Sequence, residues 1–266
     1  MAVITLITDF GASDEYVGVM KGVILGIDPL AAIVDLTHQT DLGDATSAAH
    51  MIISSYRFFP KGSIHVIVVD PGVGSERLIV AARYDGHIFI APDNGIIPFI
   101  IKEEAAHSIV CLENEDFFLK PASHTFHGRD IFAPAAARIS SGIPFDRAGS
   151  PVPLDALTRL PHEKPLIAEN ALTGKIVSTD HFGNIITNIN SDTLDKFLMK
   201  NPGKDPLFAV GDQCIKGLHK YYSGVDANIP IALIGSRGFL EMAVNLGSAK
   251  DLFMVKKGDE VRVVAV

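Results

Sequence analysis

Acidic side chains follow two apolar segments in the first part of the sequence, and they are the first candidates for chemistry. Asp9 comes directly after Val3–Thr8, and Asp70 comes directly after His65–Val69. A carboxylate at the end of a buried strand can cap the next turn by accepting backbone N–H groups. It can also accept hydrogen bonds from the two hydroxyls of a ribose. Capping is the commoner role of a single Asp, but two such residues at parallel strand ends favour a binding site.

A second polar group lies between residues 124 and 130. It contains His124, His127 and Asp130, spaced three apart, which are residue types that bind metal ions. The segment precedes a predicted helix, so this spacing does not place the three side chains on one face. A metal-dependent hydrolase is therefore the minority interpretation, and we expect no metal or other cofactor.

The last part of the sequence holds two further candidates. Asp180, Phe182 and Asn184 follow one apolar segment, and Ser236 and Arg237 follow another. Phe182 is either a core residue or a surface on which a base stacks, with Asn184 contacting the polar edge of the base. Ser236 and Arg237 form either a simple turn or a clamp for a carboxylate, to which the guanidinium fork is suited.

Composition excludes several classes of ligand. The 266 residues carry 23 Lys and Arg against 31 Asp and Glu, a net charge of −8, so clustered positive charge for nucleic-acid binding is not expected. Neither G-x-G-x-x-G after the first strand nor G-x-x-x-x-G-K-[ST] occurs, which disfavours dinucleotides and triphosphates. A bound nucleoside would therefore carry no phosphate.

The elements that must position these residues follow from hydrophobic patterning. Short Val- and Ile-rich segments are typical of strands that are buried on both faces of a parallel sheet. They alternate with helical patterns at Tyr16–Ile27, Asp44–Phe59 and Ile131–Ser141, the last with Asp130 as its cap. We expect an α/β fold with a mostly parallel sheet and some hairpin strands. The strands are predicted at Val3–Thr8, Ile33–Leu36, His65–Val69, Leu78–Ala82, His87–Ala91 and Ser108–Leu112.

The pattern changes after about residue 150, where a Pro-rich stretch resembles a linker. Beyond it come short strands, interrupted by helical patterns at Asp192–Met199 and Phe239–Leu246. We therefore expect an α/β domain over residues 1–160 and a smaller, β-rich, barrel-like domain over residues 161–266. These later strands are predicted at Gly174–Ser178, Asn184–Ile189, Leu207–Val210, Ile229–Ile234 and Glu260–Val266.

The mean hydropathy of +0.27 raises the question of a membrane span. No apolar segment approaches the roughly 20 residues that a spanning helix needs, so no membrane partner is expected. Cys111 and Cys214 stand alone, as thiols do in a reducing compartment. We expect a cytoplasmic protein.

Taken together, the motifs resemble those of the S-adenosylmethionine (SAM) hydrolases, also called SAM hydroxide adenosyltransferases, whose relatives include fluorinases and chlorinases. The resemblance runs in family order over nearly the whole chain. It rests on Thr8-Asp9-Phe10-Gly11 with Asp14, Val69-Asp70-Pro71-Gly72-Val73-Gly74, Ala91-Pro92-Asp93-Asn94-Gly95, Phe126-His127-Gly128-Arg129-Asp130, Asp180-His181-Phe182-Gly183-Asn184 and Ser236-Arg237-Gly238.

The resemblance implies a homotrimer with SAM at the subunit interface. It also implies that water or hydroxide attacks C5′ of SAM and yields adenosine and methionine. The catalytic set of the hydrolases matches Asp70, Arg77 and His127. The halogenating relatives carry a Tyr in place of Asp70, and they have an extra loop that this chain lacks, so the resemblance favours water over halide.

The binding residues that the resemblance implies are those already singled out. Asp9 would hold the ribose hydroxyls, and Phe182 and Asn184 would face the adenine. The methionine portion would contact Asp14, Asp180 and Ser236, with Arg237 nearby. Whether Asp70 or His127 accepts the proton of the water stays open, as do a non-catalytic SAM or adenosine sensor and a halogenase.

Overall fold

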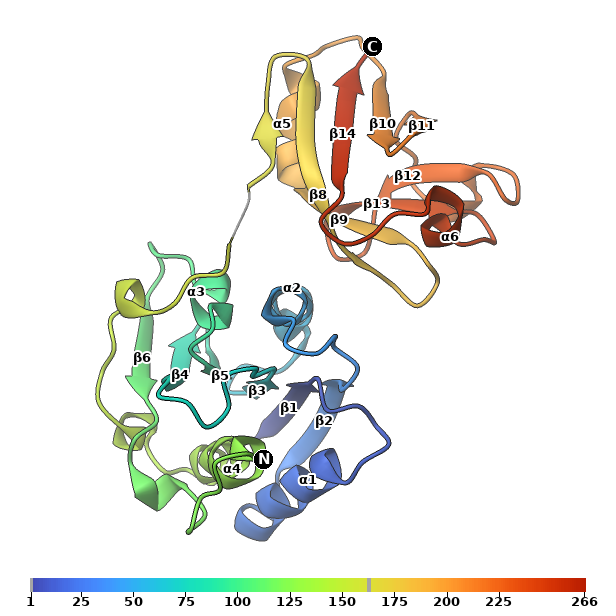
Figure 1. Cartoon of the computed structure of the whole chain (residues 1–266). Coiled ribbons are helices and arrows are strands. Elements are labelled where there is room, and N and C mark those ends of the chain that lie inside the picture. The colour runs from blue at the N-terminus through green and yellow to red at the C-terminus, as the bar shows by residue number, and fades with distance from the viewer. Residues whose placement is uncertain (1, 162–163) are drawn as a thin grey trace. The chain divides into compact units, whose positions relative to one another are not determined.

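The computed structural model describes residues 2–161 and 164–266. They form two compact units, and the boundary between the units follows Pro161. Figure 1 traces the chain through the N-terminal unit, coloured from blue to yellow-green, and then through the C-terminal unit, coloured from yellow to red.

The N-terminal unit is built on a six-stranded sheet with the order β2-β1-β3-β5-β4-β6. β1 pairs in parallel with β2 and β3, and β3 pairs in parallel with β5. β4 is antiparallel to both β5 and β6. The strands are β1 (Val3–Thr8), β2 (Ala32–Thr37), β3 (Ile64–Val68), β4 (Ile79–Tyr84), β5 (His87–Pro92) and β6 (His107–Cys111). The expected α/β fold is confirmed.

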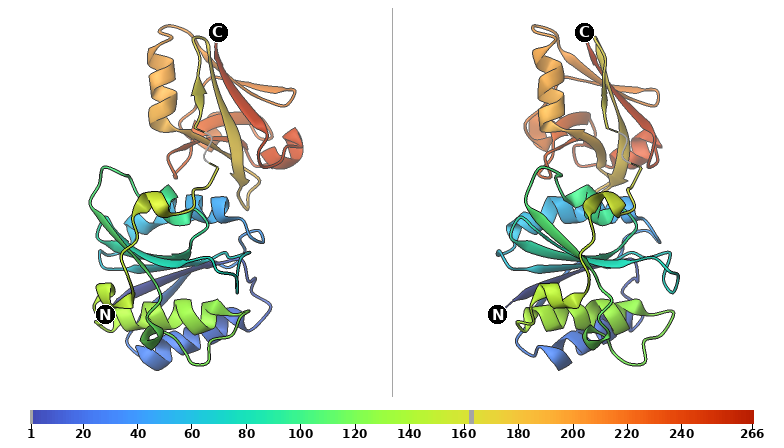
Figure 2. Two further views of the ribbon diagram at one scale, coloured as in Figure 1. Left: turned by 60° about the vertical axis from the view of Figure 1, so that its left-hand side comes forward. Right: turned by 90° about the vertical axis from the view of Figure 1, so that its left-hand side faces the viewer.

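Helices cover both faces of this sheet, as Figure 2 shows. They are α1 (Tyr16–Ile27), α2 (Ala45–Ser55), α3 (Ile96–Ile100) and α4 (Ala133–Ser140). On one face, Leu6 of β1 belongs to the same core as Met20 of α1 and several alanines of α4. On the other face, Ile7 of β1 belongs to a core with Ile52 of α2 and Ile97 of α3. Successive residues of β1 thus enter opposite cores, which is why apolar side chains lie on both faces of the strand.

The parallel strands bring the polar loop residues to one edge of the sheet. Asp9 follows β1 and Asp70 follows β3 after one further residue, and these two strands are hydrogen-bonded neighbours. Asn94 follows β5, and its Nδ2 donates a hydrogen bond to the carbonyl oxygen of Val69 at 2.8 Å. The convergence that the sequence predicts at the carboxyl ends of the strands is therefore present.

The start of the helix near residue 131 differs from the prediction. A π-helical turn over Gly128–Phe132 precedes α4, so Asp130 lies inside the helical segment and does not cap it. Its Oδ2 instead accepts a hydrogen bond from the backbone N–H of Ser123 at 2.8 Å. The wider turn places His127 directly before the first helical residue, facing the loop after β3.

The C-terminal unit is an antiparallel sheet with the strand order β11-β10-β14-β8-β9-β13-β12, and β7 pairs with β8. A β-bridge between His219, just after β11, and Leu233 of β12 brings the two ends of the sheet together, so the sheet is almost closed into a barrel. The strands are β7 (Leu166–Ile167), β8 (Ala171–Thr179), β9 (Ile185–Asn190), β10 (Pro206–Val210), β11 (Gln213–Lys216), β12 (Pro230–Ile234), β13 (Phe239–Val244) and β14 (Glu260–Ala265). The helices are α5 (Ser191–Met199) and α6 (Ala249–Phe253).

The prediction of a helix over Phe239–Leu246 is wrong, because this segment contains strand β13. Leu240 and Met242 alternate into the core of the barrel, whereas Ala243 packs on the other side of the strand. The apolar residues of this segment fit a helical period as well as a strand period, with Glu241 between them. The strands β9 and β12, which pair with β13 on its two sides, decide between the two.

The Pro-rich stretch that was expected to be a linker is packed for much of its length. Leu154 and Leu157 are buried in the core formed by α2 and α3, and the backbone N–H of Val152 bonds to Ile109. Residues 162 and 163 of this stretch lie outside the described residues. No helix in the described part of the chain is long and apolar enough to cross a membrane.

Candidate active site

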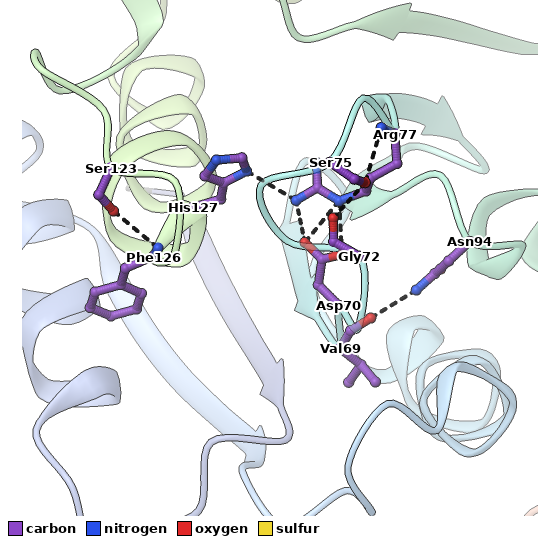
Figure 3. Close-up of polar contacts among 9 residues, drawn as sticks. All are labelled: Val69, Asp70, Gly72, Ser75, Arg77, Asn94, Ser123, Phe126 and His127. Atoms are coloured by element: carbon purple, nitrogen blue, oxygen red, sulfur yellow. Dashed lines mark hydrogen bonds and ion pairs between the residues drawn. The ribbon is translucent and has the colours of Figure 1, made fainter.

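Asp70, Arg77 and His127 form one hydrogen-bonded cluster at the edge of the N-terminal sheet. Arg77 Nε lies 2.8 and 2.9 Å from the two oxygens of Asp70, and Arg77 Nη2 also donates to Asp70 Oδ2. The same Nη2 lies 3.0 Å from Nδ1 of His127. The guanidinium therefore joins the other two side chains, as Figure 3 shows. The Asp70 and Arg77 side chains are only 5% and 11% exposed, which shields the ion pair from water.

The contact with Arg77 fixes the protonation state of His127. An arginine N–H group can only donate, so Nδ1 of His127 is the acceptor and the ring proton resides on Nε2. Burial, and then the positive charge of Arg77, lower the pKa of His127 below its ordinary value. The ring is thus neutral at physiological pH and keeps an Nε2–H donor.

The turn between β3 and β4 holds this cluster in place. Ser75 Oγ donates to the carbonyl oxygen of Gly72 at 2.7 Å, which closes the turn that follows Asp70. Gly74 has a φ of +80°, and a Cβ atom there would lie 2.3 Å from the carbonyl oxygen of His124. Only glycine permits this approach, which brings the turn against the segment that carries His127.

A small cavity of about 160 Å³ opens beside the cluster. Asp70 and His127 share its lining with the aromatic residues Phe10, Tyr16 and Phe126. The centroids of these three rings lie 5.1 to 5.9 Å apart in tilted or edge-to-face pairs. The carboxylate and the imidazole therefore border a largely apolar space.

Two other acidic residues, Asp9 and Asp14, were predicted to bind the substrate. Neither lines this cavity, and neither lines the cavity of the C-terminal unit described below. Asp9 is partly exposed, and its Oδ2 accepts the backbone N–H of Gly43 at 2.9 Å, so this carboxylate oxygen holds the loop before α2. Asp14 is exposed in the loop before α1.

The five candidates in the C-terminal unit are brought together by the fold. They line one cavity of about 820 Å³, a size suited to a small-molecule ligand. Phe182 is 74% exposed, so its ring has a free apolar face. The predicted residues that line the cavity are Asp180, Phe182, Asn184, Ser236 and Arg237.

Asp180 organises the loop that presents two of these residues. Its Oδ1 accepts the backbone N–H groups of Phe182 and Asn184, each at 2.9 Å. Its Oδ2 accepts the side-chain Nδ2 of Asn184, also at 2.9 Å. A carboxylate can only accept here, so the amide of Asn184 is oriented with Oδ1 left for another donor.

Two further residues of this cavity with titratable side chains, Tyr222 and Glu241, were not predicted from the sequence. The Tyr222 hydroxyl donates to Glu241 Oε1 at 2.5 Å, and Glu241 is only 6% exposed. Burial raises the pKa of Glu241, and burial together with the Glu241 hydrogen bond raises the pKa of Tyr222. The signal for Glu241 was its place between Leu240 and Met242, which in a strand turns it away from the core.

The residues of the metal hypothesis do not form a binding cluster. Within residues 2–161 and 164–266, no three His, Cys, Asp or Glu side chains are grouped as a metal ion would require. Asp130, one of the proposed ligands, is occupied by Arg129 Nε at 2.6 Å and by the backbone of Ser123. Its carboxylate therefore stabilises the loop before α4.

Both units match one protein family. The family model of the SAM hydroxide adenosyltransferase N-terminal domain matches residues 4–149, and the model of the C-terminal domain matches residues 174–262. The chain therefore belongs to the SAM hydroxide adenosyltransferase family, which confirms the resemblance seen in the sequence.

Individual relatives match along the full chain. A protein from Thermus thermophilus named (R)-S-adenosyl-L-methionine hydrolase is 33% identical, covering 99% of this chain and all of the relative. A hydrolase of the same name from Methanocaldococcus jannaschii is also 33% identical, over 98% and 95% of the two chains. A crystal structure of a conserved protein from Thermotoga maritima is 35% identical, with a TM-score of 0.89 over 98% of this chain and 99% of that one. A fluorinase from Nocardia brasiliensis is 26% identical over 98% and 96% of the two chains.

Proposed function

We propose that this protein hydrolyses SAM to adenosine and methionine. The observation that carries the proposal is the cluster of Asp70, Arg77 and His127, in which Asp70 and His127 line an apolar cavity. The full-length relatives named (R)-S-adenosyl-L-methionine hydrolase support the same reaction.

The reaction is a displacement at the ribose C5′ carbon. The oxygen of a water molecule forms a bond to C5′, while the bond from C5′ to the sulfonium sulfur breaks and its electron pair stays on sulfur. Methionine then leaves as a neutral thioether, so no general acid is needed for the leaving group. One proton of the water must be removed as the C–O bond forms. None of these steps requires a cofactor.

Each side chain of the cluster has a different role toward the water. Asp70 supplies the carboxylate that orients the water and accepts its proton, and positioned bases contribute about 10²–10⁴-fold to a rate. Arg77 holds that carboxylate through several hydrogen bonds and balances its charge. His127, with its proton on Nε2, donates to the oxygen of the water. This assignment makes Asp70 the proton acceptor.

An apolar cavity favours this reaction because charge is lost in the transition state. A nucleophile with hydroxide character approaches a sulfonium cation, and bulk water stabilises the separated charges more than it stabilises the transition state. The rings of Phe10, Tyr16 and Phe126 keep the space beside Asp70 dry. Holding the water oxygen, C5′ and sulfur in line lowers the activation barrier further, because the reacting atoms are already positioned.

The remaining candidates bind the substrate. Asp9 holds the ribose hydroxyls through the oxygen that Gly43 does not occupy. The free face of Phe182 stacks on the adenine, and Asn184 Oδ1 accepts from its amino group. Ser236 and Arg237 bind the carboxylate of the methionine portion, and Asp14 and Asp180 lie near that portion.

We also propose that the active form is a cytoplasmic homotrimer. Large apolar side chains on the surface of the C-terminal unit support an interface: Phe182, Leu246 and Met254 are 74%, 86% and 89% exposed. The two free thiols, Cys111 and Cys214, suit a reducing compartment.

A halogenase is the second candidate function, because fluorinases are related to this chain over most of its length. Their 26% identity is lower than the 33% of the hydrolases, and Asp70 occupies the position at which the halogenating relatives are expected to carry a Tyr. A non-catalytic sensor would have no use for the cluster of Asp70, Arg77 and His127.

Substitution of Asp70 tests the proposal. Asp70→Asn keeps an acceptor for Arg77 but removes the base, so we expect adenosine formation from SAM to fall by about 10²–10⁴-fold while SAM still binds. Chromatography of the products measures the rate, calorimetry measures binding, and circular dichroism checks folding. The matched control is Asp155→Asn, an exposed Asp of the same unit, which should retain full activity. Undiminished turnover in Asp70→Asn would remove Asp70 from the mechanism.

A further inference from the structure

Glu241 is a buried carboxylate on the wall of the C-terminal cavity. It belongs to β13, on the side of the strand that faces away from the barrel core, and only 6% of it is exposed. Its Oε1 accepts the Tyr222 hydroxyl at 2.5 Å. Its Oε2 has no hydrogen-bond partner among the described residues.

The backbone next to Glu241 is shaped to admit it. A Cβ atom at Gly235 would lie 2.1 Å from Glu241 Oε2. Any other residue at that position would therefore displace the carboxylate. Gly235 directly precedes Ser236 and Arg237, so the loop that carries these two residues passes over the carboxylate.

The other carboxylate of the cavity is committed to its own loop. Asp180 accepts hydrogen bonds from the backbone of Phe182 and from the backbone and side chain of Asn184. Glu241 accepts a single hydrogen bond, from Tyr222. Of the two, Glu241 has the greater capacity left for a ligand, since an ionised carboxylate offers about four acceptor sites.

The charges around Glu241 fit an α-amino acid group. Burial, with Asp180, raises the pKa of Glu241, whereas the Tyr222 hydrogen bond and Arg237, which lines the same cavity, act in the opposite direction. An amino acid presents a carboxylate and an ammonium group on one carbon, and its carboxylate suits the guanidinium fork of Arg237. The ammonium group then needs an anionic acceptor close by.

We infer that Glu241, held by Tyr222, is a specificity-determining residue that accepts a hydrogen bond from the α-ammonium group of the methionine portion of the substrate. The inference rests on the proposed function, because it takes SAM as the ligand. It adds a contact that selects amino acid ligands over analogues that lack the amino group.

A ligand-binding role and a structural role for Glu241 predict opposite effects on stability. Burial raises the pKa of Glu241, so its charge disfavours the unliganded fold at neutral pH. Glu241→Gln keeps the shape of the side chain and an acceptor for Tyr222 while removing the charge. The thermal midpoint of this variant without ligand should therefore equal or exceed that of the native protein, whereas a structural role requires it to fall.

Calorimetry on the full chain tests the inference with three probes: methionine, adenosine and the analogue of methionine that lacks the amino group. A hydrogen bond to a charged group contributes about 1.5–3 kcal/mol, so Glu241→Gln should weaken methionine binding by at least about tenfold. Binding of adenosine and of the deaminated analogue should not change. Glu241→Asp, which keeps the charge, should recover part of the loss. Glu260→Gln, the same change at an exposed residue of this unit, is the matched control.

Three results would overturn the inference. One is native-like methionine affinity in Glu241→Gln, and another is a loss for adenosine in place of methionine. The third is the absence of methionine binding to the native protein. The outcome is separable from that of the proposed function, which depends on turnover of SAM: methionine binding that requires Glu241 could coexist with a protein that does not hydrolyse SAM.

Discussion

Arg77 is the residue on which the proposed catalytic chemistry depends most. Its guanidinium is the only group among the described residues that is hydrogen-bonded to both Asp70 and His127. In the proposed mechanism it holds the carboxylate that accepts a proton. Its hydrogen bond to Nδ1 also keeps His127 neutral with its proton on Nε2. One cation thereby sets the roles of two titratable side chains. These roles could not be predicted from the sequence, because Asp70 and Arg77 are 50 or more residues from His127 along the chain.

Two isosteric substitutions of His127 separate its two ring nitrogens. Asn places its polar atoms near the position of Nδ1, whereas Gln places them near the position of Nε2. If Nε2–H contacts the water, His127→Gln should retain more activity than His127→Asn, and His127→Asn should lose at least about tenfold in kcat/KM, the scale of one lost hydrogen bond. Steady-state kinetics of both variants measures the order. Greater activity in His127→Asn would show that only the contact with Arg77 matters.

The pH profile of the native protein tests the same assignment. Burial and Arg77 lower the pKa of His127, so the neutral ring that the cluster needs persists below the ordinary histidine pKa of about 6.5. Log kcat/KM should therefore show no step at that pH caused by His127. A descending step near pH 6.5 that disappears in His127→Gln would contradict the assignment.

At the scale of elements, the strands β1, β3 and β5 hold the loops of the site at one edge of the sheet. A chain of hydrogen bonds crosses the interior of these strands: Thr5 Oγ1 lies 2.8 Å from His65 Nδ1, and His65 Nε2 lies 3.1 Å from His87 Nδ1. His65 and His87 are fully buried. Burial, and then the nearby His87, lower the pKa of His65 to about 3.

The buried His65 should make the N-terminal unit sensitive to acid. In the unfolded chain the pKa of His65 returns to about 6.5, so the unfolded state binds a proton first as the pH falls. The stability that His65 contributes is complete above pH 6.5 and is lost between about pH 6.5 and about pH 3, at no more than about 1.4 kcal/mol per pH unit. Urea unfolding across this range should show a shallower pH dependence in His65→Gln. If the free energy of unfolding had the same pH dependence in the variant and in the native protein, His65 would not be the cause of the acid sensitivity.

The elements also show how far the sequence could be interpreted. Strands β1 and β5 and helix α1 were predicted nearly to the residue. The two strands are short, mostly apolar segments with polar or turn residues at their ends, and α1 has Val17, Met20 and Ile24 at helical spacing. The helix predicted over Phe239–Leu246 was wrong. Leu240, Ala243 and Val244 fit a helical period, whereas Leu240, Met242 and Val244 fit a strand period. Only the pairing with β9 and β12 decides between the two. The same error explains why Glu241 was not predicted. Only in a strand does its position between Leu240 and Met242 turn it away from the core and toward the cavity.

At the scale of the whole molecule, the two units hold complementary parts of the proposed chemistry. The N-terminal unit carries the cluster that is proposed to activate water. The C-terminal unit carries the larger cavity, with Asp180, Glu241 and Arg237 on its wall. Two acidic groups and one basic group give that wall an excess of negative charge when all are ionised. SAM carries a sulfonium, an ammonium and a carboxylate, a net positive charge, whereas adenosine and zwitterionic methionine are neutral. In the proposed function the cavity and the net charge of −8 therefore favour SAM over adenosine and methionine.

Hydrolysis of SAM in water enriched in oxygen-18, with and without added halide, tests the central claim most directly. We predict that adenosine and methionine form in equal amounts, that mass spectrometry finds the label in the 5′-hydroxyl of adenosine, and that methionine carries none. Added chloride or fluoride should change neither product. The account would be contradicted if folded protein produced no adenosine, if a 5′-halogenated nucleoside formed instead, or if the label appeared in methionine.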